Sequence, residues 1–229
     1  MTGFTLAAAI SAVLLLPGSS AGQITRHALE SADGLVLRNL TATPAVLHGK
    51  KGLRLTQSGE PRQPPFLEDI AILPDPVFSN GVIEVELAGA PQAGASEGAR
   101  GFVGIAFRVQ KDDMFDAFYL RPTNGRADDQ ERRNHATQYI SHPEWPWQRL
   151  RKETPGKYES YVDLVPGVWT KIKIDVRGDK ARLYVNDAEQ PALIVNDVKS
   201  GASASGKIAL WVGSETVAHF RNLTVTRRE

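Results

Sequence analysis

The chain has 229 residues, 41% of them hydrophobic, and its 27 Lys and Arg residues nearly balance 26 Asp and Glu residues, for a net charge of +1. No basic stripe stands out, so the composition argues against a nucleic-acid partner. The sequence contains no cysteine, and the fold must therefore rest on its core without disulfide bonds, which a chain of this length can do.

The first apolar segment covers residues 6–16 and reads LAAAISAVLLL. It is too short to span a bilayer and has the length of the hydrophobic region of a signal peptide. Pro17 and Gly18 break the run, and small residues follow it. We predict that residues 1–21 are a signal peptide, that the protein is exported to the periplasm or the extracellular space, and that the mature chain begins near Gly22. A buried N-terminal strand or helix is the alternative, and no later stretch predicts a membrane span.

The rest of the chain is dominated by runs in which apolar residues alternate with polar or small ones. A period of two over four to eight residues is typical of a half-buried β-strand, with one face in the core and the other toward solvent or a groove. The apolar positions of the five clearest runs are Ile83, Val85, Leu87; Val103, Ile105, Phe107, Val109; Ile172, Ile174, Val176; Ala181, Leu183, Val185; and Ile208, Leu210, Val212. We predict one all-β domain over residues 22–229, a two-sheet antiparallel jelly-roll sandwich. Its last strand should include Phe220, Leu223 and Val225 and pair near the N-terminus.

One long segment, residues 122–155, does not follow this rhythm. It is far more polar than its surroundings, yet it carries two tryptophans, Trp145 and Trp147. Disordered segments are poor in aromatic residues, and a long irregular insertion in a compact domain is often functional. We therefore predict an ordered loop region, with a short strand near residues 136–140, that lies over one sheet.

Five short segments carry a resemblance to a known family. They read HATQY at 135–139, WQRLR at 147–151, GVWTK at 167–171, ARLYVN at 181–186 and GKIALW at 206–211. With their surroundings they resemble exported bacterial proteins near the 3-keto-disaccharide hydrolases, in the concanavalin A-like lectin and glucanase superfamily. The resemblance covers roughly residue 66 to the C-terminus and implies a carbohydrate-related function with a carbohydrate or glycoside ligand. The E-x-D-x-x-E motif of glucanases on this fold is absent, which argues against their retaining chemistry.

The sequence also suggests where a ligand would bind. Arg108 shares its predicted strand face with the small residues Gly104 and Ala106. Tyr119 and Arg121 share a face on the next strand, and Gln138 shares one with Ala136. Such a face offers planar hydrogen-bond donors for sugar hydroxyls, and aromatic rings can stack on the sugar. The predicted ligand-binding residues are Arg108, Tyr119, Arg121, Gln138, His142, Trp145 and Trp147. The alternative is that the two arginines pair with Asp116 or Asp129 and brace the loop.

Candidates for proton transfer lie in the same polar segment. Our first choices are His135, Glu144 and Asp128, because histidine titrates near neutral pH and paired carboxylates can cleave a glycosidic bond. Structural alternatives are that Asp128-Asp129 begins a turn or a cap and that His142-Pro143 forms a packed loop corner.

No metal-binding motif stands out. We predict no cofactor, with a structural calcium ion at Asp112-Asp113 and Asp128-Asp129 as a minor alternative. Two functions stay open: an enzyme that hydrolyses glycosides or 3-keto-glycosides in a cleft on one sheet face, and a non-catalytic module that binds carbohydrate or a surface. A purely structural envelope protein is a weaker third.

Overall fold

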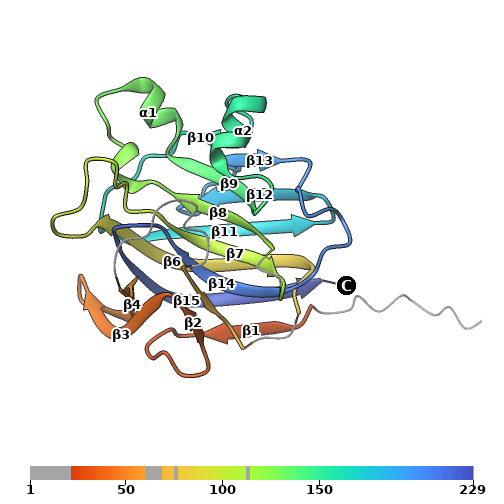
Figure 1. Cartoon of the computed structure of the whole chain (residues 1–229). Coiled ribbons are helices and arrows are strands. Elements are labelled where there is room, and N and C mark those ends of the chain that lie inside the picture. The colour runs from red at the N-terminus through yellow and green to blue at the C-terminus, as the bar shows by residue number, and fades with distance from the viewer. Residues whose placement is uncertain (1–21, 60–68, 75–76, 112–113, 229) are drawn as a thin grey trace, which may run out of the picture.

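The computed structural model describes residues 22–59, 69–74, 77–111 and 114–228. Figure 1 shows two β-sheets packed against each other, with the helices gathered at one edge. All strand pairs are antiparallel within the described residues, and the predicted two-sheet jelly-roll is confirmed. The predicted signal peptide, residues 1–21, lies outside the described residues. No helix in the described ranges is long and apolar enough to cross a membrane.

The first sheet has eight strands, among them the two longest and the first and last strands of the described residues. In spatial order its strands are β13 (Leu193–Val195), β12 (Lys180–Val185), β11 (Thr170–Arg177), β6 (Asn80–Pro91), β15 (Thr216–Arg228), β4 (Lys50–Gln57) and β3 (Leu40–Leu47). The eighth strand, β1 (Ile24–His27), pairs with β15 through register partners such as His27 and Leu223. The predicted pairing of the last strand near the N-terminus is therefore confirmed.

The second sheet has seven strands and carries the polar segment on its edge. Its order is β10 (Glu159–Ser160), β9 (Thr137–His142), β8 (Phe115–Leu120), β7 (Val103–Val109), β14 (Lys207–Val212), β5 (Ile70–Ile72) and β2 (Val36–Arg38). Strand β9 is the short strand that the sequence predicted inside residues 122–155.

The rest of the polar segment forms three short helices, which the sequence did not predict. They are η1 (Pro122–Asn124), α1 (Gln130–Asn134) and α2 (Trp147–Glu153). Asp129 caps α1, because its carboxylate accepts the backbone N–H of Arg132 at 2.6 Å. An acidic cap satisfies a backbone donor that the helix itself leaves free. Helices of five and seven residues are too short to show the 3.6-residue period that identifies a helix from sequence.

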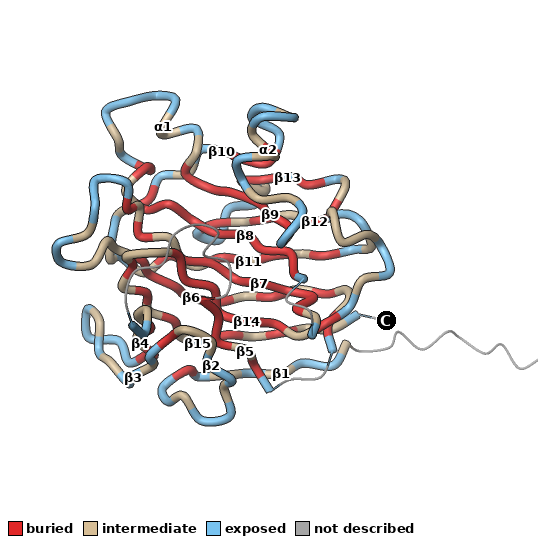
Figure 2. Tube along the Cα trace, viewed as in Figure 1, coloured by how far each residue is buried: buried red, intermediate tan, exposed pale blue. Residues whose placement is uncertain are grey.

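The core follows the predicted alternation along most strands. The apolar positions of all five predicted runs are buried, and Figure 2 shows the buried stretches running along both sheets. Strands β7 and β8 differ, because every one of their residues is buried. The centre of the second sheet is thus covered on both faces, where the pattern predicted one face toward solvent or a groove.

Arg108 is the clearest departure from the predicted ligand-binding face. It lies at a β-bulge, where the register between β14 and β7 shifts between Lys207 and Ala209, and its φ is +56°. A bulge turns a side chain away from the face that simple alternation predicts. Arg108 is 0% exposed. Its guanidinium donates hydrogen bonds to the carbonyls of Ser79, Gly178 and Gly201 at 2.7–3.1 Å and to the Ser200 hydroxyl at 3.2 Å.

These contacts make Arg108 a brace between the sheets and predict an effect on stability. We expect Arg108→Met to lower the free energy of unfolding by about 2 kcal/mol, because the substitution leaves several inward-facing carbonyls without a donor. Chemical denaturation followed by tryptophan fluorescence measures this. The matched control is Arg177→Met, on an exposed arginine that pairs with Asp175, and it should cost less than about 1 kcal/mol. An equal loss of unfolding free energy in Arg108→Met and Arg177→Met would contradict the role of Arg108 as a brace.

Candidate functional site

A cleft of about 390 Å³ is lined by residues from the loop that precedes β7 and from the helices of the polar segment. Its lining is dominated by arginine, and we call it the arginine cleft. The lining residues are Gly98, Arg100, Phe102, Arg121, Asn124, Asp129, Glu131, Arg132, His135, Trp147 and Arg151. Planar cationic donors beside an aromatic ring are a combination that suits polar ligands with flat or ring-shaped surfaces.

Arg121 forms the floor of the arginine cleft. It follows β8 directly, and its guanidinium donates to the Tyr119 hydroxyl at 3.0 Å and to the Gln138 side-chain oxygen at 3.0 Å. These three side chains meet because Tyr119 and Gln138 are register partners on neighbouring strands. Arg121 also donates to the carbonyl of His135 at 3.1 Å. The structure therefore brings together three of the four residues predicted to share this sheet face.

Glu159 is the counter-charge beneath the cleft. Its side chain is 2% exposed and binds Arg121 at 3.0 Å, and Arg151 donates to both of its oxygens, one of them from Nε at 2.9 Å. Burial alone would raise the pKa of Glu159, but the hydrogen bonds from Arg151 and the charges of Arg121 and Arg151 hold it below its ordinary value. The carboxylate therefore stays ionised and fixes two guanidiniums in place.

The same contacts give Arg121, which the sequence predicted as a ligand-binding residue, a structural role as well. Its side chain is only 6% exposed, and four acceptors bind it. Truncating Arg121 would leave Glu159 without one of its partners, so a loss of stability is expected together with any loss of binding.

His135 is the histidine that the structure places in the cleft. It ends helix α1, and its Nε2 lies 3.6 Å from a Glu159 oxygen, with the side chain 18% exposed. Burial lowers the pKa of His135, and the charges of Arg151 and Arg121 add to this effect, while Glu159 opposes it. The imidazole is therefore mostly neutral at pH 7 and can accept a proton from a bound molecule.

Trp147 supplies the exposed aromatic wall. It begins helix α2, after Pro146, and it is among the exposed large hydrophobic residues. The guanidinium carbons of Arg151 and Arg121 lie 4.6 Å and 5.8 Å from its ring centroid. The two arginines thus hold the ring at the rim by cation–π contacts.

Of the predicted site residues, Arg121, His135 and Trp147 line the cleft. Tyr119 and Gln138 are buried and bind Arg121, and the others lie elsewhere. The guanidinium carbon of Arg149 and the amine of Lys199 lie 3.8 Å and 4.6 Å from the ring centroid of Trp145. The His142 ring packs on Phe115, with the ring centroids 5.1 Å apart. The side chain of Glu144 is 77% exposed, and its closest described cation, Arg149, lies 3.9 Å away.

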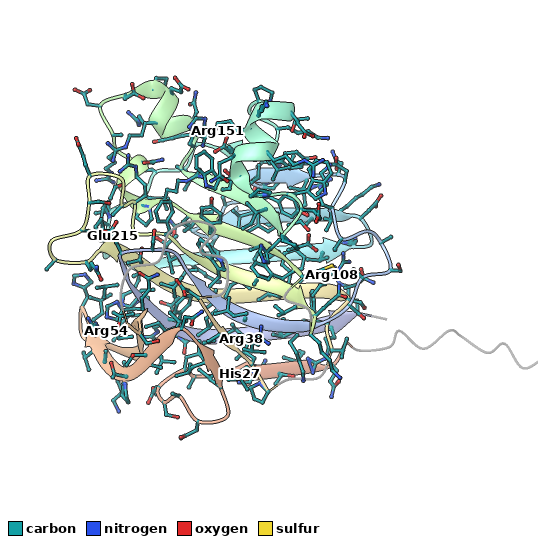
Figure 3. The ribbon with its side chains drawn as sticks, in the orientation of Figure 1. His27, Arg38, Arg54, Arg108, Arg151 and Glu215 are labelled. Carbon is teal, nitrogen blue, oxygen red and sulfur yellow. The ribbon has the colours of Figure 1, made fainter. Side chains whose placement is uncertain are left out.

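Asp128 is exposed and does not line the cleft, whereas its neighbour Asp129 does. Arg108 is remote from the cleft, as Figure 3 shows by the separate positions of Arg108 and Arg151. Arg108, Glu144 and Asp128 therefore lie apart from the residues that line the arginine cleft.

Sequence reasoning did not predict Glu159, which lies beneath the cleft, or the lining residues Arg100, Arg132 and Arg151. Glu159 lies beyond the polar segment on a two-residue strand, which produces no pattern, and it reaches the cleft because β10 pairs with β9. Arg100 lies in a Gly- and Ala-rich loop and approaches the cleft because the Thr123 N–H donates to its carbonyl at 3.3 Å. Only the abundance of arginine in residues 122–155 hinted at Arg132 and Arg151.

In the described ranges, no three His, Cys, Asp or Glu side chains come together in a way that could hold a metal ion. Asp112 and Asp113, half of the calcium alternative, lie outside the described residues. The lining of the cleft is rich in cations, which is unfavourable for a hard metal ion.

The protein is thus a jelly-roll sandwich of the lectin and glucanase type, and its arginine cleft lies at one edge of the second sheet. Residues 71–226 match the family described as "3-keto-alpha-glucoside-1,2-lyase-like domain". The match covers more than half of the chain, which therefore belongs to this family.

Solved structures share the fold at low sequence identity. The carbohydrate-binding module CBM66 from Bacillus subtilis is 13% identical, with a TM-score of 0.52, over 83% of this chain and 97% of that one. A protein with a galectin-like fold from Bacillus subtilis is 12% identical, with a TM-score of 0.54, over 89% of this chain and 96% of that one. A candidate glycosyl hydrolase from Parabacteroides distasonis is 11% identical, with a TM-score of 0.51, over 95% of this chain and 99% of that one. No curated protein sequence matches the chain.

Proposed function

We propose that this protein binds a 3-keto-glycoside in the arginine cleft and cleaves its glycosidic bond by elimination. The observation that supports it most is that His135, whose pKa burial lowers, lines a cleft rich in guanidinium groups. One of these, Arg151, has a terminal nitrogen that makes no hydrogen bond within the described residues. Membership of a family described by 3-keto-α-glucoside lyase chemistry supports the substrate class.

The chemistry of the substrate explains why these groups suffice. A ketone at C3 makes the proton at C2 acidic, and the glycosidic oxygen at C1 is then placed for elimination. His135 takes the C2 proton, the C2–H electron pair forms the C1–C2 double bond, and the C1–O bond breaks with its electron pair on oxygen. That oxygen then takes the proton from the imidazolium, which restores His135. General base catalysis of this kind contributes about 10²- to 10⁴-fold to a rate.

Arg151 is the group placed to stabilise the negative charge that develops on the ketone oxygen. Its Nε and one terminal nitrogen bind Glu159, which leaves the other terminal nitrogen for the substrate. A donor held in place before the reaction begins stabilises developing charge without reorganisation. Water added to the enone product would give net hydrolysis.

A panel of neutral glycosides and their 3-keto derivatives, scored for both binding and turnover with the mature chain, tests the proposal. We expect turnover of 3-keto-glycosides and none of the parent glycosides, because only the ketone acidifies C2. Absence of both binding and turnover across the panel would overturn the proposal.

Non-catalytic carbohydrate binding is the second candidate, and the exposed ring of Trp147 beside two guanidiniums favours it. Under this function the panel shows binding without turnover, and Trp147→Ala weakens binding about tenfold, the equivalent of about 1.4 kcal/mol. Tyr184→Ala is the matched control, because this tyrosine on the first sheet also has a cation over its ring, Lys173 at 4.0 Å.

A further inference from the structure

Two arginines of the cleft lack the counter-charge that the other two share. Arg121 and Arg151 are neutralised by Glu159. Arg132 donates instead to the Asn124 side-chain oxygen at 3.0 Å and to the Thr123 hydroxyl at 3.2 Å. Arg100 donates to the backbone carbonyls of Glu97 and Ala99. All of these acceptors are neutral, and no ion pair joins either arginine to a carboxylate among the described residues.

Arg100 and Arg132 both line the cleft, and the charge of Arg132 acts on Arg100. Arg132 binds the Thr123 side chain and the Thr123 N–H donates to the Arg100 carbonyl, so both are tied to helix η1. Burial lowers the pKa of Arg100, the like charges of Arg132 and Arg121 lower it further, and the charge of Glu97 opposes this without forming a described ion pair. Arginine still remains fully charged near neutral pH, so Arg100 and Arg132 both present a positive charge to the cleft.

The acidic residues of the lining do not cancel this charge. Asp129 uses its carboxylate to cap α1 through the backbone N–H of Arg132. Glu131 is exposed on the first turn of the same helix. Neither carboxylate forms a described ion pair with the Arg100 or Arg132 guanidinium.

We propose that Arg100 and Arg132 of the cleft bind a carboxylate on the substrate, so that the preferred ligand is an acidic sugar that contains a uronic acid unit. This inference rests on the proposed function for the identity of the cleft as a sugar site. The planar guanidinium fork matches the two oxygens of a carboxylate, and both side chains remain partly exposed to an incoming ligand. Sulfate and phosphate esters of sugars share the anionic chemistry, and the test separates them from the carboxylate.

Isothermal titration calorimetry on the mature chain provides the test. The probes are a disaccharide that contains glucuronic acid, its neutral glucose counterpart, and the 6-sulfate and 6-phosphate esters of that counterpart. We expect the uronic acid probe to bind at least tenfold more tightly than the neutral one. The preference for the uronic acid probe should fall to an intermediate value in Arg100→Gln and below about twofold in the Arg100→Gln/Arg132→Gln double variant. The uronic acid probe should lose more affinity than the neutral probe in both variants, because only its carboxylate needs the two guanidiniums.

The controls make each outcome decisive. Arg177→Gln, on an exposed arginine of the first sheet, should keep the full preference, and thermal melting confirms that each variant is folded. Equal binding of acidic and neutral probes, no binding of any probe, or equal weakening of both in the variants overturns the inference. Tighter binding of an ester than of the uronic acid overturns the carboxylate assignment. Turnover of neutral 3-keto-glycosides without any acid preference would refute this inference alone, whereas tight uronic acid binding without turnover of any 3-keto-glycoside would refute elimination alone.

Discussion

We expect His135→Gln to lower the turnover number for a 3-keto-glycoside by about 100-fold or more, because the substitution removes the base but keeps a polar side chain of similar size. The Michaelis constant should change little, since His135 acts on the C2 proton and the arginines and Trp147 hold the sugar. Steady-state kinetics on the purified variant measures both quantities. The protein should remain folded, because the His135 side chain makes no described hydrogen bond within the normal range.

The pH profile of the wild type gives a second measurement of the same group. Only the neutral imidazole accepts a proton, so turnover should fall as the pH drops through the pKa of His135. Because burial and nearby arginines lower that pKa, the fall should lie below pH 6.5. His142→Gln is the matched control, since its ring packs on Phe115 outside the cleft, and it should keep both the rate and the profile. Full turnover in His135→Gln would contradict the assignment.

Glu159→Gln should cause the largest loss of stability, about 4 kcal/mol of unfolding free energy, because it leaves the buried Arg121 charge and the Arg151 charge without their shared partner. For a chain of this size that corresponds to a fall of roughly 10 °C in melting temperature. Differential scanning calorimetry measures it. Glu153→Gln is the control, because Glu153 is exposed and pairs with Arg149 on one helix, and its expected cost is below about 0.5 kcal/mol.

The same ion pair predicts how stability depends on pH. The pKa of Glu159 is lower in the folded protein than in the unfolded chain, so the folded state binds fewer protons. The stabilisation is therefore fully present above about pH 5 and is lost as the pH falls through the unfolded and then the lowered folded pKa. In Glu159→Gln this part of the acid dependence should be missing. Equal acid sensitivity of the variant and the wild type would show that the Glu159 cluster contributes nothing.

The fold was predictable because most strands bury one face. Ile83, Val85 and Leu87 alternate with polar residues, and the structure buries them as expected. The bulge at Arg108 was not predictable, because a register shift depends on how β7 meets β14, which lies about 100 residues later in the chain.

The site was predictable in part for a similar reason. Tyr119, Arg121 and Gln138 meet because adjacent strands place them in register, and a strand pattern reveals that. Glu159 and Arg100 come from a two-residue strand and a loop, whose positions depend on tertiary contacts alone. The sequence also gave equal weight to Trp145 and Trp147, although only Trp147 begins helix α2 and lines the cleft.

The most direct test of the arginine cleft as a proton-transfer site is exchange of the C2 hydrogen of a 3-keto-glucoside in deuterated water, followed by proton NMR. We expect the C2 proton signal to disappear far faster with the wild type than in buffer alone, either by exchange with deuterium or by elimination. His135→Gln should abolish this acceleration, and His142→Gln should retain it. No acceleration by the wild type, or equal acceleration by His135→Gln, would contradict the account.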